Sequence, residues 1–211
     1  NGTIPDTCVA SAMDVSSAFN SDQTIFLGCR TNGLVVTHDG GNTWQTSVST
    51  EQLAGNSLTS VILSPDFVTD SLVYATDTRG NVVRSRNGGN TWQPVLDGLP
   101  MQTNWYGGTS LAISPGFSSD HNLIAITSKG LYGSSNSGNY WLPIPDLASP
   151  VASGVIEFAG ISPNFEQDHT ILASVRGSGL FRSDDSGLSW QQVGAGLLEN
   201  NHQLTGFVFS S

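Results

Sequence analysis

Short apolar runs recur along the chain, separated by segments rich in Gly, Ser, Asn and Thr. Runs of four to six apolar and β-branched residues bounded by turn residues predict buried β-strands rather than helices. The runs form two series, each with four members. The first series lies at residues 10–15, 58–63, 109–113 and 156–161. The second lies at residues 24–27, 72–75, 123–127 and 170–175.

A glycine-containing turn follows each run of the second series and leads into a third apolar run. Glycine supplies the positive φ that a tight hairpin needs, so the second and third runs predict antiparallel hairpins. These turns are Asn32-Gly33, Arg79-Gly80, Lys129-Gly130 and residues 177–179.

Each third run ends in an octapeptide that closes on tryptophan: THDGGNTW (37–44), SRNGGNTW (85–92), SSNSGNYW (134–141) and SDDSGLSW (183–190). The tryptophans follow one another at intervals of 48, 49 and 49 residues. A period near fifty with several short strands in each repeat is typical of propeller blades.

Each repeat therefore predicts one four-stranded antiparallel blade, its fourth strand starting at the tryptophan, and the chain is expected to be an all-β propeller. The expected blades are residues 9–50, 57–97, 108–146 and 155–195, and residues 204–211 add a lone first strand. Because a propeller closes its ring to protect sheet edges, an unpaired strand favours part of a larger propeller, or a half-ring completed by another chain, over a closed four-bladed ring.

The octapeptide resembles the Asp-box or BNR repeat: Ser or Thr, any residue, Asp or Asn, any, Gly, any, Thr, Ser or Tyr, then Trp. Its four copies cover essentially the whole chain. The resemblance is nearest to uncharacterised bacterial surface BNR-repeat proteins, and extends to sialidases, xyloglucanase-type glycosidases, the sortilin luminal domain and a photosystem II assembly factor. The chain departs from the pattern at Asn87 and Asn136, and at Ser137 and Ser186 in place of the middle glycine.

We expect the box residues to be structural. A carboxylate or amide oxygen can accept backbone N–H groups in a turn, and a tryptophan ring can bury a large surface between sheets. In the resembled family these turns also lie away from the active site. The structural set is Asp39, Trp44, Asn87, Trp92, Asn136, Trp141, Asp185 and Trp190.

Four of the seven Lys and Arg residues occupy the hairpin turns between the second and third strands, which lie on a face where propellers commonly bind ligands. They are Arg30, Arg79, Lys129 and Arg176. One interpretation is an electropositive arc that recognises an anionic ligand, such as a carboxylate-bearing sugar. The other, which we favour, is that exposed turns tolerate cations that pair with neighbours such as Asp77.

The links between blades contain a second candidate. Trp105 is the tryptophan outside the boxes, and Tyr106 follows it. An exposed Trp-Tyr pair can stack on a sugar or anchor a partner protein, and it can equally fill the gap between two blades.

Cys8 precedes the first strand and Cys29 ends the second, so antiparallel pairing can bring them to one end of the blade as a disulfide. The four histidines show no zinc-ligand spacing, and no metal site is predicted. Asp70, Asp120 and Asp168 recur before the second strands and are expected to cap their loops. Calcium binding by these oxygen-rich turns is the alternative.

The formal net charge is −10, with seven Lys and Arg in 211 residues. Such a chain lacks the clustered cations that phosphate backbones require, so nucleic acid is not an expected partner. No apolar stretch approaches the length of a membrane span. The scarcity of Lys and the cysteine pair favour an extracellular, cell-surface or periplasmic location. A first residue other than Met is expected for a processed product or an excised piece.

Two functions fit these features. The favoured one is a non-catalytic scaffold or binding module that recognises a protein partner or a glycan and needs no cofactor. The alternative, implied by the resemblance, is a fragment of a sialidase-like or xyloglucanase-like glycosidase. Sialidase-like chemistry requires an arginine triad, a Tyr–Glu nucleophile and an acid/base Asp. None of Glu51, Glu157, Glu166 and Glu199 stands in a matching context.

Overall fold

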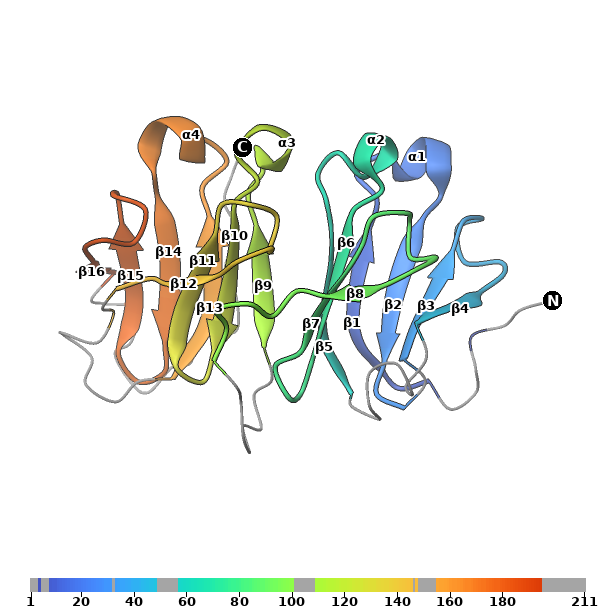
Figure 1. Cartoon of the computed structure of the whole chain (residues 1–211), viewed down its shortest axis with the longest axis horizontal. Helices are drawn as coiled ribbons and strands as arrows, with labels where there is room; N and C mark the ends of the chain where they lie inside the picture. The colour runs from blue at the N-terminus through green and yellow to red at the C-terminus, as the bar shows by residue number, and fades with distance from the viewer. Residues whose placement is uncertain are drawn as a thin grey trace. The chain divides into compact units, whose positions relative to one another are not determined.

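The computed structural model describes residues 4, 8–31, 33–48, 57–100, 109–145, 147 and 155–194. The chain divides into two compact units. Unit 1 comprises residues 1–96 and 101–109, and unit 2 comprises residues 97–100 and 110–211. Each unit contains two four-stranded antiparallel sheets, one for each of two consecutive repeats (Figure 1).

In unit 1 the first sheet has the order β1 (Ala10–Val15), β2 (Ile25–Cys29), β3 (Gly33–Thr37) and β4 (Gln45–Val48). The second sheet has the order β5 (Leu58–Leu63), β6 (Val73–Asp77), β7 (Val82–Ser85) and β8 (Gln93–Pro94).

In unit 2 the corresponding sheets are β9 (Ser110–Ile113), β10 (Leu123–Thr127), β11 (Gly130–Ser134) and β12 (Leu142–Pro143), followed by β13 (Ile156–Ile161), β14 (Ile171–Val175), β15 (Gly179–Ser183) and β16 (Gln191–Val193). The strands follow chain order across every sheet, which is the connectivity that the repeat predicts. The predicted strand beyond residue 203 lies outside the described residues.

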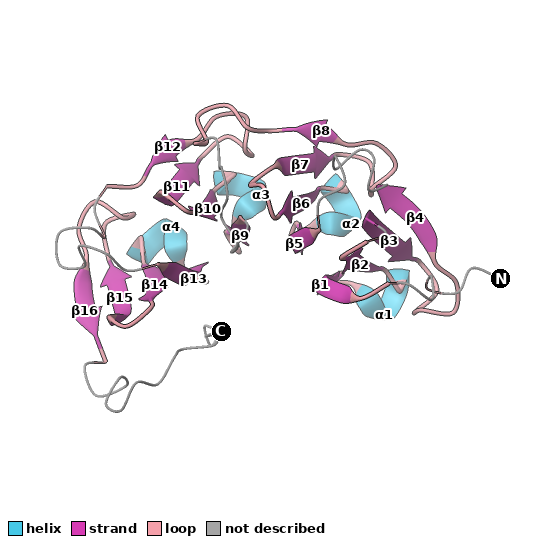
Figure 2. Ribbon diagram, turned by 90° about the horizontal axis from the view of Figure 1, so that it is seen from below, coloured by secondary structure: helices cyan, strands magenta, loops and turns pink. Residues whose placement is uncertain are grey.

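The two sheets of each unit pack face to face, with their first strands close together and their fourth strands farthest apart (Figure 2). In unit 1 the core between the sheets is formed by Phe26, Leu34, Leu58, Val73 and their neighbours. In unit 2 the corresponding core contains Ile124, Leu131, Ile171 and Phe181. β2, β3 and β6 are buried along almost their whole length, which explains their continuous apolar sequences.

The segment between the first and second strands of each sheet was expected to be a loop, and it contains a one-turn helix. These helices are α1 (Phe19–Asp22), α2 (Phe67–Asp70), α3 (Phe117–Asp120) and α4 (Phe165–Asp168). In each helix the final aspartate accepts a hydrogen bond from a serine six residues earlier, as in Ser64 Oγ to Asp70 Oδ2 at 2.5 Å. Its other oxygen accepts the N–H of the residue just before the next strand, as in Leu72 N to Asp70 Oδ1 at 2.9 Å.

The box turns lie at the same end of the sheets as the one-turn helices. In each sheet one backbone hydrogen bond joins the box to the residue after the helix, as in Gly88 N to Ser71 O at 3.0 Å. The hairpin turns lie at the opposite end of each unit (Figure 1).

A disulfide joins Cys8 to Cys29, with a Cα–Cα distance of 5.0 Å. It fastens the segment before β1 to the end of β2, where the backbone N–H of Arg30 also donates to Val9 O at 2.9 Å. Cys8 and Trp44 pack against a small core formed by Leu27, Cys29 and Val35.

Candidate functional site

The box aspartates and asparagines are fully engaged in holding their own turns. Asp39 accepts hydrogen bonds from Thr37 Oγ1 at 2.7 Å, Thr43 N at 2.8 Å and Thr43 Oγ1 at 2.6 Å. Asn87 reproduces this pattern, because its Oδ1 accepts from Ser85 Oγ and Thr91 N, and its Nδ2 donates to Thr91 Oγ1. The amide therefore replaces the carboxylate by reversing the direction of one hydrogen bond.

The hydrogen bonds to the box carboxylates also set their acidity. Two hydrogen bonds from Thr43 lower the pKa of Asp39 to about 2, and the bond from the hydroxyl has a larger effect than the bond from the backbone N–H. Ser189 lowers the pKa of Asp185 to about 2 in the same way. A carboxyl group that stays ionised to such low pH is poorly suited to donating a proton in catalysis.

The box tryptophans lie within or beside the apolar cores. Trp92 and Trp190 pack against the cores of units 1 and 2, respectively. Trp141 is 1% exposed, and its backbone N–H donates to Asp97 O at 2.8 Å. The indole N–H groups of Trp44, Trp92 and Trp190 donate to carbonyl oxygens of their own boxes. None of the described box side chains is arranged as a reactive group.

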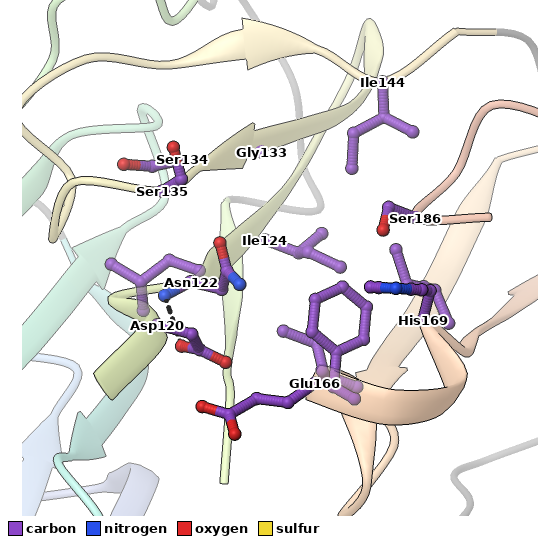
Figure 3. A pocket seen from close by; sticks show the side chains of 14 residues that line it. Asp120, Asn122, Ile124, Gly133, Ser134, Ser135, Ile144, Glu166, His169 and Ser186 are labelled. Atoms are coloured by element: carbon purple, nitrogen blue, oxygen red, sulfur yellow. Dashed lines mark hydrogen bonds between the residues drawn. The ribbon is translucent and has the colours of Figure 1, made fainter. Parts of the chain in front are cut away.

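A cavity of about 450 Å³ opens in unit 2 between its two sheets, at the end that carries α3 and α4 (Figure 3). Its floor and walls are apolar and are formed by Ile124, Ile144, Ile161, Phe165 and Ile171. Polar side chains surround the opening: Asp120, Asn122, Ser135, Glu166, His169 and Ser186. A concave apolar site of this size with a few convergent polar groups has the properties of a ligand pocket. We call it the crevice pocket.

The two carboxylates at the opening face the same point. A Cβ atom added to Gly116 would lie 3.5 Å from both Asp120 Oδ2 and Glu166 Oε1. The oxygens of Asp120 accept hydrogen bonds from Ser114 Oγ at 2.6 Å and Asn122 N at 2.8 Å. Glu166 Oε1 accepts from the hydroxyl of Ser119.

His169 borders the pocket from the residue that follows α4. Its backbone is in the left-handed region, with φ of 49°, and its ring packs edge-on against Phe165 at a centroid distance of 5.9 Å. Ser186 stands beside it, also at positive φ, and donates its N–H to His169 O. The fourth-repeat side of the opening is therefore built from the helix end and the box turn, and it faces Asp120 and Asn122 of the third repeat.

The crevice pocket exists because the repeats of unit 2 differ from those of unit 1. Phe26 occupies the position of Ile124; it is fully buried and packs edge-on against Phe67 at a centroid distance of 6.0 Å. Ser47 occupies the position of Ile144 and donates to Gly89 O at 2.7 Å. A phenylalanine ring thus fills in unit 1 the place that is open in unit 2.

Two groups at the rim differ between the units as well. Glu166 corresponds to Val68, and His169 corresponds to Ser71. Four of the differences between the two pairs of repeats therefore lie at one cavity.

The structure places the four predicted cations at the other end of the units, exposed at the ends of the second strands or in the hairpin turns. Arg176 pairs with Glu157, Nε to Oε1 at 2.7 Å. The backbone N–H of Arg79 donates to Asp77 Oδ1. None of the four lines the crevice pocket. Trp105 and Tyr106 lie outside the described residues.

Among the described residues, no cluster of three or more His, Cys, Asp or Glu side chains is arranged to hold a metal ion. The repeated aspartates that were considered for calcium direct their oxygens at serine hydroxyls and backbone N–H groups. The described helices each form a single turn, and none is long and apolar enough to cross a bilayer.

Sequence reasoning missed the residues of the crevice pocket. It considered Glu166 as a catalytic acid without a matching context, and His169 as one of four scattered histidines. The available signal was the set of positions at which the four aligned repeats disagree, because a change from Phe26 to Ile124 at a core position leaves space.

Neither a family model nor a curated protein matches this chain. Several solved structures do. An ancestral GH74 enzyme aligns at a TM-score of 0.70 and 20% identity over 92% of this chain and 26% of its own. The GH74 xyloglucanase from Xanthomonas campestris aligns at a TM-score of 0.64 and 17% identity, over 82% of this chain and 28% of its own.

YCF48, solved with a bound D1 peptide, aligns at a TM-score of 0.62 and 15% identity, over 91% of this chain and 56% of its own. This chain thus spans about a quarter of the GH74 enzymes and about half of YCF48. The predicted β-propeller architecture is confirmed by these alignments and by the four antiparallel sheets. At such low identity the likeness concerns the fold.

Proposed function

We propose that the chain is a non-catalytic binding module of the Asp-box propeller type, and that it holds its ligand in the crevice pocket of unit 2. The meeting of four repeat differences at one cavity is the observation that carries this proposal. Ile124, Ile144, Glu166 and His169 all depart from their counterparts in unit 1, and all four line the cavity. Membership of the Asp-box group is supported by the hydrogen-bond pattern that the four turns share.

A binding role is favoured over hydrolysis by the state of the two carboxylates. Glycosidases work with two carboxyl groups on either side of the scissile bond, one of them free to give up a proton. Asp120 has a counterpart in every repeat, at Asp22, Asp70 and Asp168, and each holds a serine hydroxyl and a backbone N–H. Asp120 is therefore part of the scaffold, which leaves Glu166 without a catalytic partner at the pocket.

The double substitution Ile124→Phe with Ile144→Ser tests the site, because it copies Phe26 and Ser47 of unit 1. The added ring only partly replaces the aliphatic volume lost at Ile144, so we expect the unfolding free energy to fall by about 2 kcal/mol with the fold retained. In the wild type, capped dipeptides and oligosaccharides are screened by isoleucine-methyl NMR. We expect ligand-dependent shifts at Ile124, Ile144, Ile161 and Ile171 and none at Ile25 or Ile62, which lie in unit 1.

The double variant should lose the shifts at Ile161 and Ile171 while remaining folded. Binding that persists in the variant, or that appears only at the unit 1 methyls, would place the ligand site elsewhere. Incubation with xyloglucan oligosaccharides should release no reducing ends, and release by the wild type that the double variant lacks would overturn the non-catalytic assignment.

A further inference from the structure

We infer that the occupant of the crevice pocket is a basic peptide segment of a partner protein. An apolar side chain of the segment enters against the isoleucines, and a neighbouring lysine or arginine meets Glu166 at the rim. This inference rests on the proposed function and names the chemistry of its ligand.

The charge at the opening has one sign. Asp120 and Glu166 contribute two carboxylates, and no Lys or Arg lines the pocket. Asp120 uses both oxygens within its own turn, but Glu166 is exposed and its recorded partner is a single hydroxyl, that of Ser119. A carboxylate has two oxygens with about four acceptor positions, so Glu166 retains capacity for an ammonium or guanidinium group.

The interior of the pocket suits an aliphatic side chain. Ile124, Ile161 and Ile171 are 3%, 5% and 2% exposed, so the floor consists of well-packed methyl groups. Lysine and arginine also carry apolar stems that lie along such surfaces while their charged ends remain in water. A dipeptide of one aliphatic and one basic residue therefore matches both the apolar interior of the pocket and the carboxylate at its opening.

A sugar fits these features less well. Proteins that bind sugar rings commonly offer an exposed aromatic face on which the ring stacks. Phe165 is the aromatic side chain lining the pocket, and its ring is already in T-shaped contact with His169. Val68, which replaces Glu166 in unit 1, further indicates that the carboxylate is specific to the open pocket.

Three capped dipeptides with the same apolar residue test the inference: acetyl-Leu-Lys-amide, acetyl-Leu-Gln-amide and acetyl-Leu-Glu-amide. Affinity is measured by titrating the methyl shifts of Ile124 and Ile144. We expect the Gln peptide to bind about fivefold more weakly than the Lys peptide, as the loss of one exposed ion pair predicts, and the Glu peptide to bind more weakly still. Added salt should reduce the difference.

Substitution of the rim carboxylate should change charge preference without affecting the apolar contact. In Glu166→Gln the Lys and Gln peptides should bind equally, and in Glu166→Lys the Glu peptide should become the strongest. Glu157→Gln is the matched control: it removes an equal charge from unit 2 at the residue that pairs with Arg176, and the wild-type order should persist.

The outcomes separate the two proposals. Equal affinity of all three peptides in the wild type, with shifts confined to the pocket methyls, overturns the basic-peptide inference and leaves the binding site standing. Pocket shifts with oligosaccharides and none with peptides overturn it in favour of a sugar. Failure of every peptide and oligosaccharide to shift the pocket methyls overturns the proposed function itself.

Discussion

Asp39 and Asn87 perform the same task with different atoms, and the difference has a consequence in acid. The carboxylate of Asp39 accepts from Thr43, which holds its pKa at about 2, below the ordinary value of 3.8. A lowered folded-state pKa means that the ionised form stabilises the fold. This contribution is fully present above the unfolded pKa and is lost as the pH falls from about 4 towards 2.

Asp39→Asn should therefore flatten the pH dependence of stability between pH 2 and 4 while preserving the turn, since Asn87 and Asn136 already build the same turn. The reciprocal variant Asn87→Asp should add pH dependence of the same sign. Urea unfolding at pH 2, 3, 4 and 5 measures both effects. An Asp39→Asn variant with the pH profile of the wild type would show that the carboxylate does not act in this way.

The function of the box residues follows readily from the sequence, because the same residue types recur in all four turns. Their backbone conformation follows less readily. Ser137 and Ser186 adopt φ of 59° in the positions where Gly40 and Gly88 have φ of 69° and 63°. Their N–H groups donate to the residue after the preceding helix, a tertiary contact that overrides the usual preference for glycine.

At the contact between two sheets of a unit, the second glycine of the box leaves no room for a side chain. A Cβ atom on Gly89 would lie 2.4 Å from Ser47 Oγ and 2.8 Å from Phe26 Cε1, both in the neighbouring sheet. Gly187 has the same relation to Ile144, at 2.3 Å from its Cγ2. Gly41, at the same position in the first box, has its own Trp44 as the nearest neighbour, at 3.8 Å.

Gly89→Ala and Gly41→Ala form a matched pair for this contact. Both residues have positive φ, so each substitution costs about 1–2 kcal/mol of backbone strain. Gly89→Ala must also displace Ser47 or Phe26, and overpacking adds about 1–3 kcal/mol. Urea unfolding should show Gly89→Ala to be the more destabilising of the two, and equal losses would mean that sheet packing does not depend on this glycine.

The second and third strands could be predicted because they are apolar, continuous and separated by glycine turns. The one-turn helices could not, since four residues are too few to show a helical period. The fourth strands were expected to start at the tryptophans. In the structure β4, β8, β12 and β16 each begin one residue later, because each indole belongs to the turn.

Residues that the four repeats share build the sheets and turns, and residues that differ between the two units line the crevice pocket. The crevice pocket could not be predicted because its residues come from two repeats, and only the packing of one sheet on the next brings Ile124 and Ile144 against Ile161 and Phe165. Each predicted cation belongs to a single turn, so the pattern of cations is visible in the sequence. None of these cations lines a described cavity.

This view predicts that a pocket can be opened in unit 1. Phe26→Ile with Ser47→Ile copies unit 2, and should bind acetyl-Leu-Lys-amide and acetyl-Leu-Gln-amide with similar affinity, because Val68 stands in place of Glu166. The loss of the Phe26–Phe67 contact should lower the unfolding free energy by about 1 kcal/mol. Methyl NMR at the two new isoleucines measures binding, and a charge preference equal to that of unit 2 would contradict the role given to Glu166.

The outer edges of two sheets limit how a partner can attach to those sheets. β8 and β12 have two residues each, and in both the second residue is a proline, Pro94 and Pro143. Proline has no amide hydrogen, and so short an edge offers few backbone groups to an incoming chain. A visiting polypeptide gains few backbone hydrogen bonds at these two edges, so attachment there depends mainly on side-chain shape and charge.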